Sequence, residues 1–169
     1  IGGANLENQL LILAAAALWC LMLFLPPLTA AIEAPSSSIS KPMYRFYATI
    51  CHQYETRSLH ILGFKIAVCA RCFGIYAGFF VGCLLYPLIF KRQKFHGLFG
   101  WCLIALPMAV DVFFDITGIH TSTITTRLVT GLFFGYGAAA ILMPFIISGL
   151  LEIISKKNIL KGVTHELKT

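Results

Sequence analysis

Residues 9–31 read QLLILAAAALWCLMLFLPPLTAA and contain no charged side chain. A helix needs about 20 residues to cross a hydrocarbon core of about 30 Å, so this run is long enough to span a bilayer. The run is also too long for the apolar core of a secretory signal, and the first basic residue of the chain, Lys41, lies after it. We therefore expect it to be retained as a membrane-spanning helix.

Three further apolar runs of similar length follow, at about residues 70–90, 96–117 and 128–154. Of the 169 residues, 58% are hydrophobic and 12% are charged, whereas roughly a quarter are charged in an average soluble domain. A soluble domain of this length could not bury so much apolar surface. The sequence thus predicts an all-α polytopic membrane protein, a single membrane domain over residues 1–169 that forms a four-transmembrane-helix bundle and contacts membrane lipid.

The connection between the first two runs, residues 33–68, is the only long one. It opens with a polar stretch at residues 34–38, which is typical of a linker. Apolar and aromatic side chains then recur at helical spacing, namely Met43, Phe46, Tyr47, Ile50 and Tyr54. This pattern is typical of an amphipathic helix in the membrane interface, which we predict within residues 42–62, before Gly63 breaks the pattern.

The formal net charge of +6 comes from basic residues clustered between the apolar runs. Such clusters flank membrane helices, whereas a nucleic-acid surface needs a basic stripe with exposed aromatic side chains, so we exclude nucleic acid as a partner. Basic residues are densest in the turn at residues 91–94 and in the C-terminal tail. In a prokaryotic inner membrane this density favours the turn and tail as cytoplasmic, and the long connection as extracytoplasmic.

Small residues recur four apart in two of the runs. One ridge contains Gly74, Gly78 and Gly82, and the other contains Gly131 and Gly135. In lipid, such ridges let helix backbones approach closely and drive association. We predict that they pack within the bundle, with a homo-oligomer or another membrane subunit as the alternative partner.

Three cysteines and a histidine gather near the end of the long connection, where residues 51–53 read CHQ and residues 69–72 read CARC. A Cys-x-x-Cys pair with a further cysteine and a histidine can hold a tetrahedral metal ion. The predicted ligands are Cys51, His52, Cys69 and Cys72, with zinc as the expected ion and iron as the alternative. His60 or His120 would supply the fourth ligand if adjacent residues cannot both reach one ion.

The same cysteines allow two other chemistries, with no metal bound. Cys69 and Cys72 lie at the expected start of a helix, where the helix dipole and Arg71 would stabilise thiolate, so the pair could exchange thiol and disulfide. A structural disulfide between Cys51 and one member of the pair would suit an oxidising compartment. The remaining cysteines lie inside apolar runs, where a thiol behaves as a small hydrophobic group: Cys20, Cys83 and Cys102.

Two carboxylates lie within the third run. Asp111 and Asp115 are four residues apart and so share one helix face. An ionised carboxylate inside a bilayer costs about 2–3 kcal/mol on insertion scales, so it needs a cation or a polar cavity. Arg127 is the expected cation for Asp111, and Arg71 is the next candidate. Either a structural ion pair or a functional role, such as catalysis, metal binding or headgroup binding, is predicted for Asp111, Asp115 and Arg127.

These motifs resemble a family of small prokaryotic membrane proteins known only as a domain of unknown function. The resemblance rests on CHQ at residues 51–53, on CARCFGIYAG at residues 69–78, and on a later pattern. That pattern comprises Asp111, Ser122, Arg127, Thr130, Gly131 and Gly135. The resemblance implies the membrane architecture and this choice of residues, but no activity, and Asp115 stands where the family pattern has glutamine.

Several enzyme motifs are absent from the sequence, including a phosphate-binding glycine loop, a nucleophile elbow and the His-Glu-x-x-His pair. The sequence leaves open whether the protein is an enzyme. It predicts a small integral membrane protein with a cysteine/histidine metal centre at one membrane surface. The alternatives are a membrane thiol–disulfide oxidoreductase and a non-catalytic subunit of a larger membrane complex.

Overall fold

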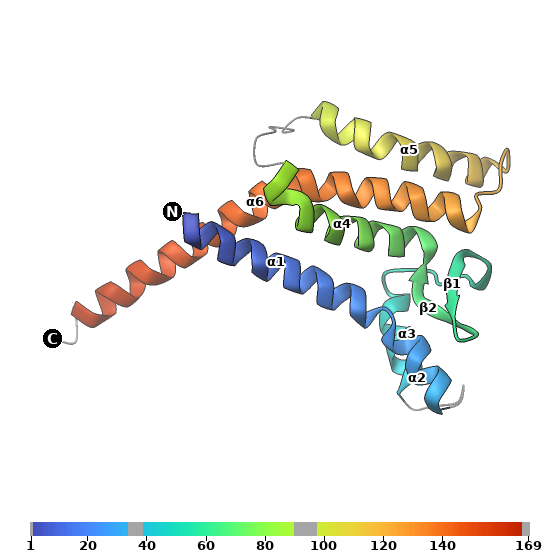
Figure 1. Cartoon of the computed structure of the whole chain (residues 1–169), viewed down its shortest axis with the longest axis horizontal. Helices are drawn as coiled ribbons and strands as arrows, with labels where there is room; N and C mark the ends of the chain where they lie inside the picture. Colours follow the sequence, from blue (N-terminus) through green and yellow to red (C-terminus); the bar gives the residue numbers. More distant parts are fainter. Residues whose placement is uncertain (1, 34–38, 90–97, 167–169) are drawn as a thin grey trace.

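The computed structural model of the chain describes residues 2–33, 39–89 and 98–166 (Figure 1). The helices are α1 Gly2–Met22, α2 Leu25–Glu33, α3 Ser40–Ala48, α4 Ala70–Ile89, α5 Leu98–Thr117 and α6 Ile124–Glu166. Between α3 and α4 lie a 3-10 turn, Glu55–Arg57, and two strands, β1 Ser58–Ile61 and β2 Phe64–Cys69. The predicted linker at residues 34–38 and the basic turn at residues 91–94 lie outside the described residues.

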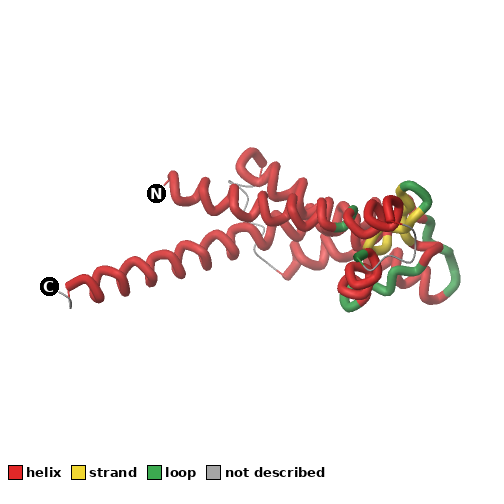
Figure 2. Tube along the Cα trace, turned by 90° about the horizontal axis from the view of Figure 1, so that it is seen from below, coloured by secondary structure: helices red, strands yellow, loops and turns green. Residues whose placement is uncertain are grey.

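Four helical segments are long and apolar enough to cross a membrane, and they confirm the predicted four-span, mainly helical fold. Their bounds are Leu6–Ile32, Ala70–Leu88, Gly100–Thr117 and Ile124–Lys156. Large apolar side chains point outward along them, for example Leu11 and Ile116, which are 64% and 79% exposed. Such exposure suits contact with lipid rather than water. The strands gather at one end of the bundle, beside the connection between α5 and α6 (Figures 1 and 2).

The first span contains a break that the sequence analysis did not predict. Helix α1 ends at Met22 and α2 begins at Leu25, with a turn between them. Pro26 and Pro27 lie in the first turn of α2, where their missing N–H groups leave no helical hydrogen bond unmade. Leu23 is fully buried, and its carbonyl accepts a hydrogen bond from the Ala67 N–H of β2 at 3.4 Å. The break therefore fastens the first span to the hairpin.

The interfacial helix is shorter than predicted. Helix α3 ends at Ala48, so the extension of the helix through Ile50 and Tyr54 is wrong. The chain instead forms an antiparallel hairpin, in which Ile61 pairs with Phe64. The two turn residues, Leu62 and Gly63, have φ values of 53° and 82°, as in the tight turns that match the twist of a hairpin. This hairpin, rather than a longer helix, leads the chain into α4.

The two glycine ridges pack against each other, as predicted for packing within the bundle. A Cβ atom on Gly78 would lie 2.2 Å from the Leu132 carbonyl oxygen, and one on Gly135 would lie 2.0 Å from that of Ile75. Only glycine allows α4 and α6 to approach so closely. Each ridge is thus covered by the other helix, whereas a homo-oligomer or another membrane subunit as a partner stays a prediction.

We expect Gly135→Ala to lower the melting temperature of the purified protein in detergent by about 2–12 °C. The added methyl group would meet backbone atoms of α4, which can make room only if the two helices separate. Gly149→Ala on the same helix is the matched control, because apart from the adjoining backbone of α6 no atom of the described residues lies within 4 Å of its added Cβ. Equal melting temperatures for the two variants would contradict the close approach of α4 and α6.

Candidate metal centre

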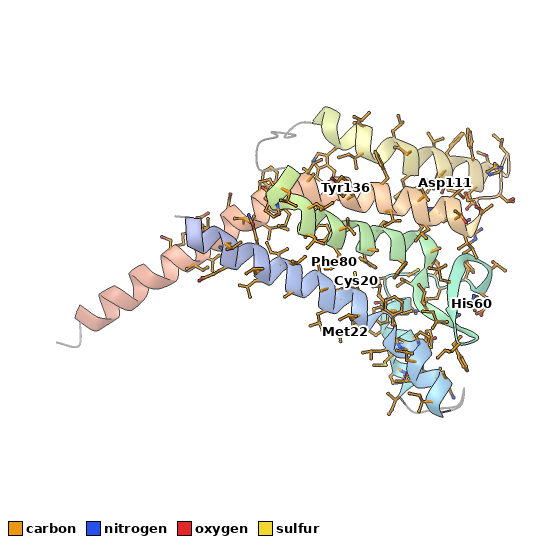
Figure 3. All side chains as sticks on the ribbon, in the orientation of Figure 1. Cys20, Met22, His60, Phe80, Asp111 and Tyr136 are labelled. Atoms are coloured by element: carbon orange, nitrogen blue, oxygen red, sulfur yellow. The ribbon has the colours of Figure 1, made fainter. Side chains whose placement is uncertain are left out.

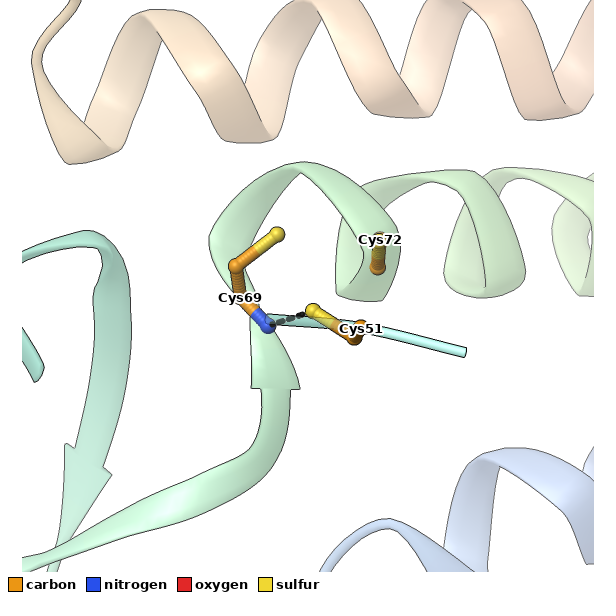
Figure 4. A group of neighbouring side chains, drawn as sticks. All are labelled: Cys51, Cys69 and Cys72. Carbon is orange, nitrogen blue, oxygen red and sulfur yellow. Dashed lines mark hydrogen bonds between the residues drawn. The ribbon is translucent and has the colours of Figure 1, made fainter. Parts of the chain in front are cut away.

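Three cysteines converge where β2 continues into α4. Cys69 is the last residue of β2, Cys72 lies in the first turn of α4, and Cys51 comes from the loop after α3. Their Sγ atoms all lie within 4.8 Å of one another (Figure 4). Zn–S bonds of about 2.3 Å in a tetrahedral site place two sulfur atoms roughly 3.8 Å apart. The three side chains therefore fit a metal ion after small adjustments.

The backbone around the cysteines favours negative charge on sulfur. The Cys69 N–H donates a hydrogen bond to Cys51 Sγ at 3.2 Å (Figure 4). Helix α4 begins at Ala70, so the positive end of its dipole lies beside the cluster. Hydrogen bonds with the Cys51 and Cys72 thiols lower the pKa of the Cys69 thiol below its usual range. Thiolate, the form that binds metal, is therefore favoured at this position.

Gln53 holds the loop that carries Cys51. Its backbone has a φ of 50°, and its side chain is buried. The side-chain amide donates to the carbonyl oxygens of Tyr44 at 2.9 Å and Ala67 at 2.7 Å, while the Gln53 carbonyl accepts from Lys65 Nζ at 3.0 Å. These bonds join α3, the loop and β2. Gln53 thus has a structural role, and its place in the CHQ motif was the only signal for it in the sequence.

His52 lies beside the three cysteines without joining their group. Its exposed ring stacks on Tyr54, with the ring centroids 5.9 Å apart and the planes 6° from parallel. It nevertheless lines the same cavity as the cysteines, and its role as a ligand stays a prediction. The alternative histidines lie elsewhere, because His60 contacts Glu55 at 2.8 Å and His120 is exposed between α5 and α6.

Two ion pairs join α4, α5 and α6 at the same end of the bundle, where Figure 3 places Asp111. Arg127 Nη2 donates to both carboxylate oxygens of Asp115 at 2.7 Å, and Arg71 Nη2 donates to Asp111 Oδ2. The predicted pairing of Arg127 with Asp111 is therefore wrong. Asp115 lies one turn nearer the end of α5, at the level of Arg127 in the first turn of α6, which leaves Asp111 to Arg71.

Ser122 and Arg57 complete this charged cluster. The Ser122 hydroxyl donates to Asp111 Oδ1 at 2.8 Å, its N–H donates to Asp115 Oδ1 at 3.3 Å, and its carbonyl accepts from Arg127 Nε at 3.2 Å. Arg57 Nη1, from the 3-10 turn, lies 3.7 Å from Asp115 Oδ2. The sequence analysis assigned no carboxylate to either residue, because their meeting depends on how the hairpin and the α5–α6 connection fold.

A cavity of about 200 Å³ lies between the cysteines and the charged cluster. It is lined by the three cysteines and by three arginines, Arg57, Arg71 and Arg127. Among the described residues, the two carboxylates that pair with these arginines are not part of the lining. Sulfur and guanidinium groups therefore face one small space at the end of the bundle.

The comparisons with known proteins cover this whole site. Residues 51–142 match the family described as "Predicted membrane protein (DUF2085)". The chain is similar to an uncharacterized protein of Methanocaldococcus jannaschii, with 38% identity over 156 residues that cover 89% of this chain and 97% of that protein. It is also similar to an uncharacterized protein of Methanothermobacter thermautotrophicus, with 33% identity over 92 residues, which are 54% of this chain and 83% of that protein. No solved structure matches the chain.

Proposed function

We propose, from the premise that this chain belongs to the DUF2085 family of predicted membrane proteins, that it binds a metal ion at one membrane surface. Cys51, Cys69 and Cys72 are the proposed ligands. The observation that supports this is the meeting of three sulfur atoms, from two separate segments, within 4.8 Å of one another. Cysteine thiolates in a tetrahedral set suit zinc first and iron second.

Three thiolates leave one position of a tetrahedral ion for a fourth ligand. His52 is the proposed fourth ligand, because it adjoins Cys51 in the chain and lines the same cavity. The density of basic residues in the turn and tail supports an extracytoplasmic position for the centre. A centre of this kind has a structural role if all four ligands come from the chain, and a catalytic one if the fourth position stays open.

A thiol–disulfide oxidoreductase is the second candidate, because Cys69 and Cys72 lie at the N-terminus of α4 with their sulfur atoms close together. The presence of a third cysteine, Cys51, favours the metal proposal over the oxidoreductase. Cys51 brings a further sulfur to the pair and already accepts a backbone hydrogen bond, as metal-bound thiolates commonly do. A two-cysteine redox pair would not require it.

Elemental analysis of the purified protein, with a free-thiol count before and after reduction, tests the proposal. We expect about one zinc or iron ion per chain, since the site offers one set of ligands. We also expect the thiol count to be unchanged by reductant once the metal has been removed. Metal-free protein in which two thiols appear only after reduction would contradict the metal proposal and support the oxidoreductase.

A further inference from the structure

Three arginines from separate segments line the cavity beside the cysteines. Arg57 comes from the 3-10 turn, Arg71 from α4 and Arg127 from α6. Their side chains are 45%, 14% and 4% exposed, respectively. The carboxylates paired with them are not among the described residues that line the cavity, so arginines supply the permanently charged side chains of its described lining.

The charges and hydrogen-bond donors of this cluster are not fully matched within it. Three arginines face two carboxylates, which leaves one positive charge in excess. The Arg71 Nε atom is buried and has no hydrogen-bond partner among the residues that the structure describes. A buried donor without a partner destabilises a protein, and an excess positive charge attracts an anion. An anion in the cavity would balance the excess charge and accept hydrogen bonds from the arginines that line it.

The geometry points to a phosphate-type oxyanion as the ligand of this cavity, and we propose that it binds there. The guanidinium fork of arginine matches phosphate and carboxylate oxygens. Three such groups approaching from different segments suit a tetrahedral oxyanion, which accepts hydrogen bonds in several directions. The volume of about 200 Å³ is smaller than the roughly 300–1,000 Å³ of most ligand pockets, so the bound group has few atoms.

The same chemistry is available from two sources. The residues that line the cavity include Arg71 and Arg127, near the ends of two spans, and Arg57, just before the hairpin, where lipid headgroups would surround the protein. A phosphate group could therefore arrive as a free ion or as part of a phospholipid. The cavity also adjoins the proposed metal centre, but the arginines and the unpartnered Arg71 Nε are present whether or not a metal binds. The proposal thus goes beyond the metal centre and does not depend on it.

Isothermal titration of inorganic phosphate into the full chain, purified in dodecyl maltoside without phospholipid, tests the proposal. We expect Arg57→Gln to raise the dissociation constant about tenfold or more, because it removes one charged donor. Arg71→Lys, which keeps the charge but lacks the guanidinium fork, is expected to weaken binding as well. Arg45→Gln is the matched control, because Arg45 is exposed on α3 and is not part of the cavity lining.

Further titrations distinguish free phosphate from a phospholipid headgroup, and they test the anion site separately from the metal centre. Short-chain phosphatidic acid that binds about tenfold or more tightly than phosphate would identify a lipid headgroup, and equal binding would identify the free ion. Phosphate binding retained in Cys72→Ser would support the anion site even if metal is lost. The proposal is overturned if the wild-type protein binds neither ligand, if Arg57→Gln behaves like Arg45→Gln, or if acetate binds as tightly as phosphate.

Discussion

Cys72→Ser is expected to reduce the metal content of the purified protein from about one ion per chain to nearly none. Serine keeps the shape of the side chain but replaces a thiolate with a hydroxyl, which is a poor ligand for zinc at neutral pH. Only two of the three converging sulfur atoms would then remain. The measurement is elemental analysis of the variant and the wild-type protein, each dialysed against a weak chelator.

Cys83→Ser provides the matched control on the same helix. Cys83 is buried against Met143, with 3.6 Å between its Sγ and the Met143 Sδ, and it does not belong to the three-cysteine group. This variant is expected to keep its metal while losing some stability, because a hydroxyl replaces an apolar contact. Equal metal loss in both variants, or full metal content in Cys72→Ser, would show that the ligands have been chosen wrongly.

Arg127→Gln is expected to lower the melting temperature by about 10 °C, the largest stability effect that we predict for a side chain of the charged cluster. The change removes both hydrogen bonds to Asp115 and the donor to the Ser122 carbonyl. Of the partners described above, the carboxylate would keep the Ser122 N–H, at 3.3 Å, and the more distant Arg57, at 3.7 Å. Thermal unfolding in detergent, followed by circular dichroism, measures the effect.

The double variant Arg127→Gln with Asp115→Asn shows where the effect comes from. If the loss reflects a carboxylate left without its cation, removing that charge should restore part of the melting temperature. Arg45→Gln again serves as the control for losing an exposed arginine. A melting temperature for Arg127→Gln no lower than that of Arg45→Gln would mean that the ion pair does not hold α5 to α6.

The four spans could be predicted from the sequence because length and apolar composition suffice to place a helix in lipid. The hairpin could not. Strand β1 has only four residues, and its turn places Leu62 in the left-handed region, which leucine rarely adopts. Gly63 signalled a break in the chain but not the kind of structure that follows it. The aromatic spacing before it therefore suggested a longer helix than the chain forms.

The residues of the site could be predicted from the sequence, but their ion-pair partners could be predicted less well. The cysteines could be found because their spacing carries its own chemistry. The partners of Asp111 and Asp115 depend instead on how α5 and α6 are rotated and at what depth they meet, which tertiary packing decides. The roles of Gln53 and Ser122 likewise become apparent only in the folded structure, where the segments that their hydrogen bonds join lie side by side.

The hydrogen bond from the Ala67 N–H to the Leu23 carbonyl implies an order in which parts of this protein fold during synthesis. Helix α1 leaves the ribosome before β2 does, and the turn at the end of α1 is completed only after β2 has been translated. The CARC segment begins at Cys69, the last residue of β2, so the cysteine cluster can form only after the hairpin has been translated. The proposed metal ion would therefore bind only after residues 51–72 have been synthesised, later than the first span.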